Sequence, residues 1–265
     1  MSKIITFMPL SYLFYSRIDS IKEALSWIYL FPAFCFFVCF FYGSTVLSLV
    51  AILKFVVIFL TVISVYEIGY LFNDLKSSSR EKEPSIRVSD CWYQDNFGKL
   101  VFFRGLFSLL FFAIFYYVSE PVVLLQFFIA VLLLSLAFYL HNRIRGRFNV
   151  ITFLILSFFK YYSVVFLVDD YYVFLLIFFS FPLLRSIEYG LIKGYIPLRF
   201  AKDLFLNDRH FFRFLYLLFI TLFSFVILSI NNISVYYIFI PLYFLVFRFF
   251  LFSFNKDFIL KRFSK

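Results

Sequence analysis

Long hydrophobic runs, separated by polar stretches of unequal length, dominate the chain from residue 24 to residue 254. A helix that crosses a membrane needs about 20 mainly apolar residues, and on that template the pattern predicts about eight such helices. Their expected positions are 24–42, 46–71, 100–118, 121–140, 149–167, 171–188, 211–230 and 233–254. The pattern therefore predicts an all-α fold, a polytopic transmembrane helical bundle that forms a single integral membrane domain over residues 1–265.

The composition supports a membrane protein. Hydrophobic residues make up 64% of the chain and charged residues only 15%, whereas soluble proteins carry about 45–50% apolar and about 25% charged residues. This excludes an ordinary soluble enzyme, a disordered chain and a small disulfide-stapled domain. With 3 cysteines and 2 histidines, neither a disulfide framework nor a zinc site is expected.

The positive charge is distributed unevenly between alternate connections. Lys and Arg gather at both termini and in the stretches 76–99, 143–147 and 193–209, while the short connections 43–45, 119–121, 168–170 and 231–233 contain none. Basic loops stay on the cytoplasmic side of a membrane. We therefore expect a protein of the inner membrane with both termini and all long loops on the cytoplasmic side. We interpret the net charge of +10 as a consequence of this membrane topology rather than as a sign of nucleic-acid binding.

Five charged residues lie within the predicted spans: Lys54, Glu67, Arg104, Lys160 and Arg248. Such residues usually face the interior of a bundle. Lys160 lies about two-thirds of the way through its span, where it either pairs with a carboxylate such as Glu67 or lines a cavity for an anion. Arg104 and Arg248 lie nearer to span ends, where snorkelling to the headgroups is the simpler expectation.

The first candidate site closes the second span. Tyr70, Asn73 and Asp74 are followed by Glu81 in the next loop, and on a continuous helix Glu67 and Asp74 share a face. Magnesium binds oxygen ligands and is held by one or two carboxylates together with substrate phosphates. The nearby cations that would bind those phosphates are Arg80, Lys82 and Arg87. The alternative is a solvated helix end of mixed charge.

Two further candidate sites close the fourth and sixth spans. Tyr139, Arg143 and Arg145 form a cationic cluster without acidic residues, which suits either an anion site or plain topology. Arg185 and Glu188 close the sixth span. They form either a ligand-binding site or a snorkelling arginine beside an acidic residue at a helix end.

These motifs resemble the UbiA superfamily of intramembrane prenyltransferases over roughly residues 15–220. Asn73 and Asp74 match the start of its first motif, N-D-x-x-D-x-x-x-D, in which Ser77 stands at the middle acid and Glu81 at the last. Tyr139 is similar to the family's Tyr before a cation. The resemblance implies a bundle of eight to nine helices and a Mg²⁺ cofactor held by Asn73, Asp74 and Glu81.

Within the superfamily the chain is most similar to the polyprenyl-phosphate (decaprenyl-phosphate) phosphoribosyltransferases. That branch has K-R-R-x-E where others have a second acidic motif, and Arg185 and Glu188 resemble it. Arg17 and Lys22 resemble its R-P-x-Q-W-x-K-N start. The resemblance implies transfer of 5-phosphoribose, or a related phosphosugar, from phosphoribosyl diphosphate to polyprenyl phosphate for cell-surface polysaccharide synthesis. The residues expected to act or bind are Asp74, Glu81, Arg185 and Glu188, with Lys22, Tyr70, Asn73, Arg80, Lys82, Arg87, Tyr139, Arg143, Arg145 and Lys160.

The charges themselves favour this branch, because two anionic substrates require cations more than carboxylates. The segment 185–213 has six basic residues against three acidic ones. An isoprenyl-diphosphate-dependent prenyltransferase acting on a small acceptor is the alternative enzyme. A non-catalytic scaffold or a lipid-linked sugar translocator is the alternative of another class.

Overall fold

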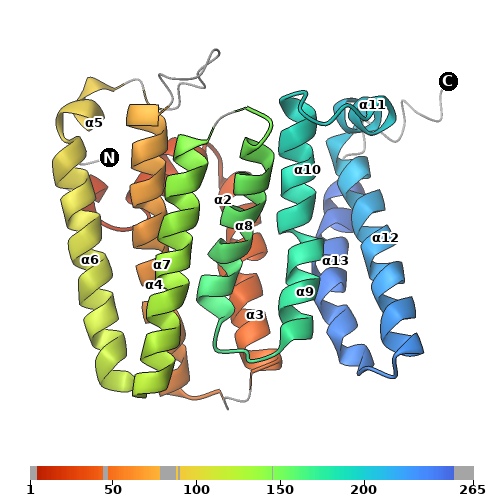
Figure 1. Ribbon diagram of the computed structural model, residues 1–265, viewed down its shortest axis with the longest axis horizontal. Coiled ribbons are helices and arrows are strands. Elements are labelled where there is room, and N and C mark those ends of the chain that lie inside the picture. The colour runs from red at the N-terminus through yellow and green to blue at the C-terminus, as the bar shows by residue number, and fades with distance from the viewer. Residues whose placement is uncertain (1–4, 44–46, 78–87, 89, 145, 254–265) are drawn as a thin grey trace. The chain divides into compact units, whose positions relative to one another are not determined.

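The computed structural model describes residues 5–43, 47–77, 88, 90–144 and 146–253. Within these ranges every regular element is a helix (Figure 1), which confirms the predicted all-α fold class. The chain divides into two compact units, Met1–Asp169 and Asp170–Lys265. The expectation of one membrane domain over the whole chain stays a prediction.

Six of the described helices are long and apolar enough to cross a membrane, so the chain is a multi-pass helical membrane protein. They are Ile21–Phe41, Leu49–Ser77, Phe97–Val118, Pro121–Arg143, Tyr171–Ile192 and Arg209–Ile230. Two shorter apolar helices are Asn149–Val165 and Val235–Leu251. All eight segments overlap the spans that the hydrophobic pattern predicts. The number of crossings and a UbiA-like arrangement stay predictions.

The first span is not a uniform α-helix. It consists of α2 (Ile21–Ile28), a π-helical turn (Tyr29–Ala33) and α3 (Phe34–Phe41). Pro32 lies inside the turn, and because proline has no backbone N–H it interrupts the hydrogen bonds of the helix. Tyr161 donates its hydroxyl to the Leu30 carbonyl in this turn at 2.7 Å. That bond satisfies one carbonyl of the irregular turn and joins it to α8 (Asn149–Val165).

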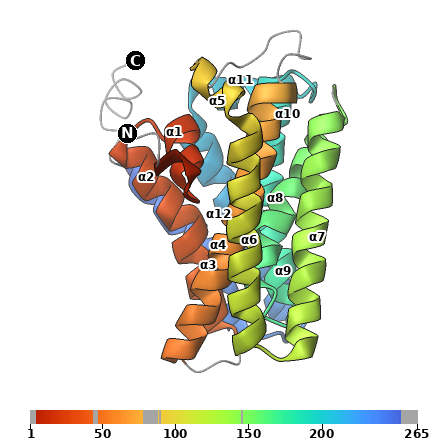
Figure 2. The same cartoon turned by 90° about the vertical axis from the view of Figure 1, so that its left-hand side faces the viewer.

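The rest of the first unit consists mainly of four long helices: α4 (Leu49–Phe72), α6 (Phe97–Val118), α7 (Pro121–Arg143) and α8 (Asn149–Val165). Helices α6 and α7 run in opposite directions (Figure 2). Helix α4 packs closely on α7 at Gly69, where a Cβ atom would lie 2.4 Å from the Phe138 ring. Asn142 donates to the Gly69 carbonyl at 3.1 Å. Helix α4 then ends in a π-helical turn, Asn73–Ser77, and this turn carries the first candidate site.

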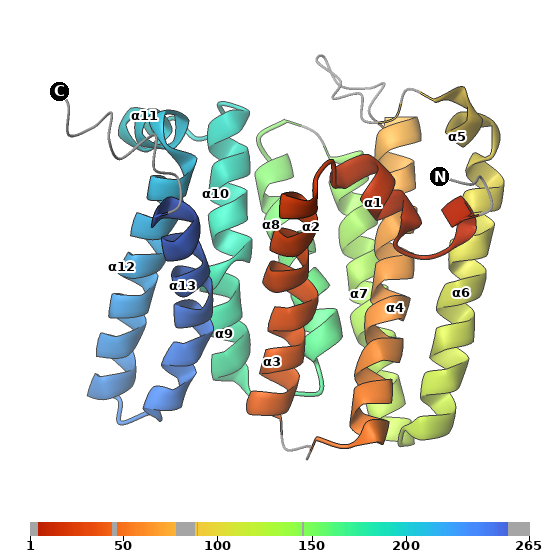
Figure 3. The ribbon, with the colours of Figure 1, turned by 180° about the vertical axis from the view of Figure 1, so that it is seen from behind.

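Two short helices pack near that end of the unit. Helix α1 (Ser11–Arg17) lies beside α4 and α5 (Cys91–Asp95) precedes α6 (Figure 3). Buried side chains from these segments form one cluster: Tyr12, Leu71, Val88, Tyr93 and Leu100. Burying such apolar side chains stabilises the docking of α1, although hydrophobic periodicity did not predict this short helix.

The second unit contains α9 (Tyr171–Ser180), α10 (Pro182–Ile192), α11 (Arg199–Asn207), α12 (Arg209–Ile230) and α13 (Phe239–Ser253). Pro182 begins α10, so the predicted sixth span is interrupted at Phe181. Tyr216 on α12 donates its hydroxyl to the Phe179 carbonyl beside this interruption at 2.7 Å. As in the first unit, a tyrosine from a neighbouring helix satisfies a carbonyl at a helix irregularity.

Candidate functional site

The carboxylate of Asp74 lies at the centre of a hydrogen-bonded cluster in the first unit. Arg17 Nη2 donates to its two oxygens at 2.7 and 2.8 Å, and the Tyr12 hydroxyl donates at 3.1 Å. The Asn73 amide nitrogen donates at 3.2 Å. Burial, together with the charge of Asp74 and the hydrogen bond from Tyr12 to Asp74, raises the pKa of Tyr12 well above its usual range. Tyr12 therefore stays a hydrogen-bond donor at neutral pH.

Aromatic rings connect this cluster to Lys160. The Arg17 guanidinium lies 4.2 Å from the centroid of the Tyr70 ring, and Tyr70 meets Tyr66 edge to face at 4.8 Å. The Lys160 ammonium lies 4.0 Å from the Phe31 centroid and 5.0 Å from that of Tyr66. Cations are attracted to such ring faces. The first unit thus brings Asp74, Asn73, Tyr70 and Lys160, which the sequence singled out, into one connected group.

A second ion pair lies beside this group and corrects two sequence-based expectations. Arg104 is 0% exposed and pairs with Glu67 at 3.2 Å, so the expectation that Arg104 snorkels to the headgroups is wrong. Glu67 also accepts the backbone N–H groups of Leu10 and Leu13 at 3.1 and 2.7 Å. The cation of Glu67 is therefore Arg104 rather than Lys160.

Glu67 and Asp74 both bind the N-terminal segment, which confirms that they share one face of the second span. Arg104 contributes to the same docking, because it donates to the Met8 carbonyl at 3.2 Å and to the Ser11 hydroxyl at 3.0 Å. The buried pair therefore holds α1, and with it Arg17, against α4.

Other predicted residues of the first unit lie apart from this ion-pair network or outside the described residues. Arg143 donates a hydrogen bond to the hydroxyl of Tyr139 on the exposed end of α7. Lys22 is exposed in the first turn of α2. The residues that lie outside the described part of the chain are Arg80, Glu81, Lys82, Arg87 and Arg145.

The second unit has its own buried carboxylate. Glu188 accepts hydrogen bonds from Arg185 and from Arg213, whose Nη2 lies 3.0 Å from Oε2. Glu188 is 2% exposed and Arg185 is 39% exposed, so Arg185 keeps donors open to a ligand. Arg248 is buried and lies close enough to add positive charge at Glu188. The expectation that Arg248 snorkels is therefore wrong as well.

The metal expectation can be tested against the donor set of the first unit. Asp74 offers one carboxylate and Asn73 one amide oxygen, while Ser77 is buried and offers no carboxylate. Among the described residues no group of three or more His, Cys, Asp or Glu side chains could hold a metal ion by itself. Magnesium often needs only one or two carboxylates when substrate phosphates supply further oxygens. Asp74 and Asn73 offer oxygen ligands of the type that suits a magnesium ion arriving with a diphosphate, but both Asp74 oxygens accept hydrogen bonds from Arg17, so such an ion would have to displace Arg17 from Asp74.

The sequence reasoning had missed several partners in these clusters. Tyr12, Tyr66, Phe31 and Arg213 were not singled out as site residues, and Arg17 was noted only as part of a family pattern. No spacing rule could reveal them, because Arg17 and Asp74 are 57 positions apart and Arg213 and Glu188 are 25 apart. The one available signal for these partners in the sequence was the presence of arginines near the ends of predicted spans.

Comparison of the chain with known protein families, with curated proteins and with solved structures finds no match.

Proposed function

We propose that the protein transfers 5-phosphoribose, or a related phosphosugar, from phosphoribosyl diphosphate to polyprenyl phosphate, with Mg²⁺, at the cytoplasmic face of the inner membrane. The product would feed cell-surface polysaccharide synthesis. One observation carries the proposal most directly: each unit holds a buried carboxylate beside arginines at the end of a span, Asp74 with Arg17 and Glu188 with Arg185 and Arg213. Guanidinium groups match phosphates well.

The reaction fits a site made of cationic side chains and aromatic rings. The bond between ribose C1 and the diphosphate breaks, a phosphate oxygen of the lipid forms the new bond to C1, and diphosphate leaves. A lipid phosphate is already an oxyanion at neutral pH, so its attack needs no general base. The site has to stabilise the charge of the departing diphosphate and exclude water from the electron-poor C1.

Each described group has a role in this proposal. Asp74 and Asn73 would hold Mg²⁺, which adds positive charge at the diphosphate oxygens. Arg17 would donate to the diphosphate, and the face of the Tyr70 ring, whose centroid lies 4.2 Å from the guanidinium carbon, would help to hold it in place. Lys160 receives the lipid phosphate or the second donor phosphate from its position between Phe31 and Tyr66.

In the second unit Arg185 binds a donor phosphate with its exposed donors. Both oxygens of Glu188 are engaged by arginines. The geometry therefore supports Glu188 as the residue that orients Arg185 and Arg213.

The test is label transfer by purified protein. Protein in nanodiscs receives radiolabelled phosphoribosyl diphosphate, undecaprenyl phosphate and Mg²⁺, and label in the organic phase is measured with and without EDTA. We expect metal-dependent transfer that is lost in Asp74→Asn and reduced at least tenfold in Arg185→Gln. Lys99→Gln, an exposed charge removal on α6, serves as the control and should leave transfer unchanged. Near-normal transfer by Asp74→Asn would refute the metal assignment, and transfer only from an isoprenyl diphosphate would establish a prenyltransferase.

A further inference from the structure

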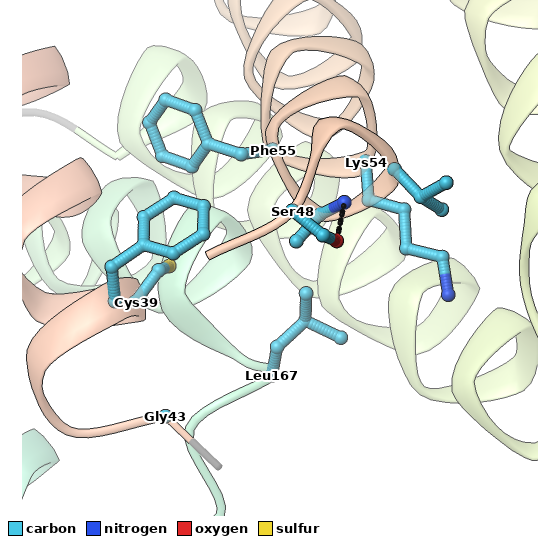
Figure 4. A pocket seen from close by; sticks show the side chains of 9 residues that line it. Cys39, Gly43, Ser48, Lys54, Phe55 and Leu167 are labelled. Carbon is cyan, nitrogen blue, oxygen red and sulfur yellow. Dashed lines mark hydrogen bonds between the residues drawn. The ribbon is translucent and has the colours of Figure 1, made fainter. Parts of the chain in front are cut away.

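A pocket of about 340 Å³ opens at the end of the first unit where α3 ends and α4 begins (Figure 4). Its lining is mostly apolar and includes one cation; the residues are Cys39, Phe40, Gly43, Ser48, Val50, Ala51, Lys54, Phe55 and Leu167. Ser48 caps α4 by accepting the Ala51 backbone N–H at 3.2 Å. The volume of the pocket lies at the lower end of the range for small-molecule sites, about 300–1,000 Å³.

This pocket is distinct from the candidate site around Asp74. Lys54 and Asp74 lie on one continuous helix, Leu49–Ser77. The 20 positions between them span about 30 Å at 1.5 Å per residue, which matches the thickness of the hydrocarbon core of a bilayer. The pocket therefore opens to the leaflet opposite to that of Asp74.

Lys54 has no charge partner within the described part of the chain. It is half-buried, and none of the hydrogen bonds or salt bridges between described residues involves it. A charged side chain inside a span is costly unless it is paired or reaches water or headgroups. An anion bound at the pocket would supply the missing negative charge.

The charge distribution of the sequence does not explain this lysine. The short connections on the predicted outer side carry no Lys or Arg, so Lys54 departs from a pattern that keeps cations on the other side. Cys39 and Phe55 lie on one side of the pocket and the Lys54 amine on the other (Figure 4). Apolar walls with one cation at the rim are complementary to an amphiphile with an anionic head.

We propose that this pocket binds one anionic phospholipid of the outer leaflet, with its phosphate at Lys54 and the start of an acyl chain against Ala51, Phe55 and Leu167. The inference does not rest on the proposed transfer reaction, because it uses neither Asp74 nor Lys160. The shared chemistry is a phosphate group, and the source we favour is the lipid because most of the lining is apolar.

Native mass spectrometry of detergent-purified protein tests the proposal. The protein is titrated with phosphatidylglycerol, with phosphatidylcholine or with inorganic phosphate. We expect one phosphatidylglycerol molecule to be retained by the wild type and by Lys54→Arg. Retention should fall about fivefold in Lys54→Gln, the effect of one cation near an anionic headgroup. Ala51→Phe, which fills the pocket and keeps the lysine, should lower retention as well.

The outcomes decide the proposal. Lys99→Gln removes a lysine at the other end of the unit and should leave retention at the wild-type level. Equal retention by Lys54→Gln and the wild type, or equal retention of phosphatidylcholine and phosphatidylglycerol, overturns the proposal. Binding of inorganic phosphate that displaces the lipid overturns the lipid assignment. Unchanged elution and melting of each variant show that a loss of lipid reflects the pocket and not unfolding.

Discussion

The Glu67–Arg104 pair makes a quantitative prediction about how the N-terminal helix is held. Both side chains are buried, at 1% and 0% exposure. Removing one partner of a buried pair leaves an uncompensated charge and costs about 3–5 kcal/mol. Arg104→Met would leave Glu67 with two backbone donors, and Glu67→Gln would leave Arg104 with one carbonyl and one hydroxyl. Each single variant should therefore be strongly destabilised.

The double variant Glu67→Gln/Arg104→Met has no buried charge left. Its remaining cost is the hydrogen bonds that Arg104 made to Met8 and Ser11, at about 1 kcal/mol each. We expect it to be more stable than either single variant and to show a coupling energy of at least about 2 kcal/mol.

Thermal unfolding of the purified protein in detergent measures these effects. A loss of 3–5 kcal/mol corresponds to a fall in Tm of roughly 6–20 °C. Arg143→Met, which removes an exposed arginine whose hydrogen bond goes to Tyr139, is the matched control and should shift Tm little. Single variants that melt like the wild type, or a double variant whose loss equals the sum of the two singles, would refute the reasoning.

Three further predictions concern packing and protonation. Gly69→Ala forces Phe138 away by overpacking and should lower stability by about 1–3 kcal/mol. A lower Tm is expected, and an unchanged Tm would contradict the close approach. Tyr216→Phe removes the bond to the Phe179 carbonyl and should cost about 1 kcal/mol in thermal unfolding; no cost would show that this bond is not formed. Burial, with smaller contributions from Tyr15 and Asp90, raises the pKa of Tyr93 to about 12. Because the unfolded value is about 10, the folded state binds the proton more tightly, and stability falls as pH rises from about 10 towards 12; Tyr93→Phe should reduce that fall, and an equal fall would argue against a buried phenol.

The hydrophobic pattern predicted where the helices lie but not where they are irregular. The π-helical turn at Pro32 and the interruption at Phe181 leave the hydrophobic runs intact. At each irregularity a tyrosine from a helix distant in sequence, Tyr161 or Tyr216, donates to a backbone carbonyl. Hydropathy cannot anticipate such partners, because they are set by packing.

The candidate site was predictable only in part, for a related reason. Local spacing pointed to Asp74 and Lys160 because an acid and a lysine in apolar surroundings are conspicuous in the sequence. The same reasoning did not anticipate a cation paired with Asp74, whereas the structure pairs Asp74 with Arg17, since the N-terminal helix folds back onto α4. Arg104 was expected to snorkel because it lies near the end of a span, and its partner Glu67, which is 37 positions away, could not be found from spacing.

The most direct test of the proposed function is the identity of the lipid product. Wild-type protein is incubated with phosphoribosyl diphosphate, undecaprenyl phosphate and Mg²⁺. The molecular mass of the extracted lipid is determined by mass spectrometry, and the released diphosphate is quantified. The account predicts a lipid that carries one added phosphoribosyl group, with one diphosphate released for each product molecule. An unchanged lipid from protein that demonstrably binds both substrates would contradict it.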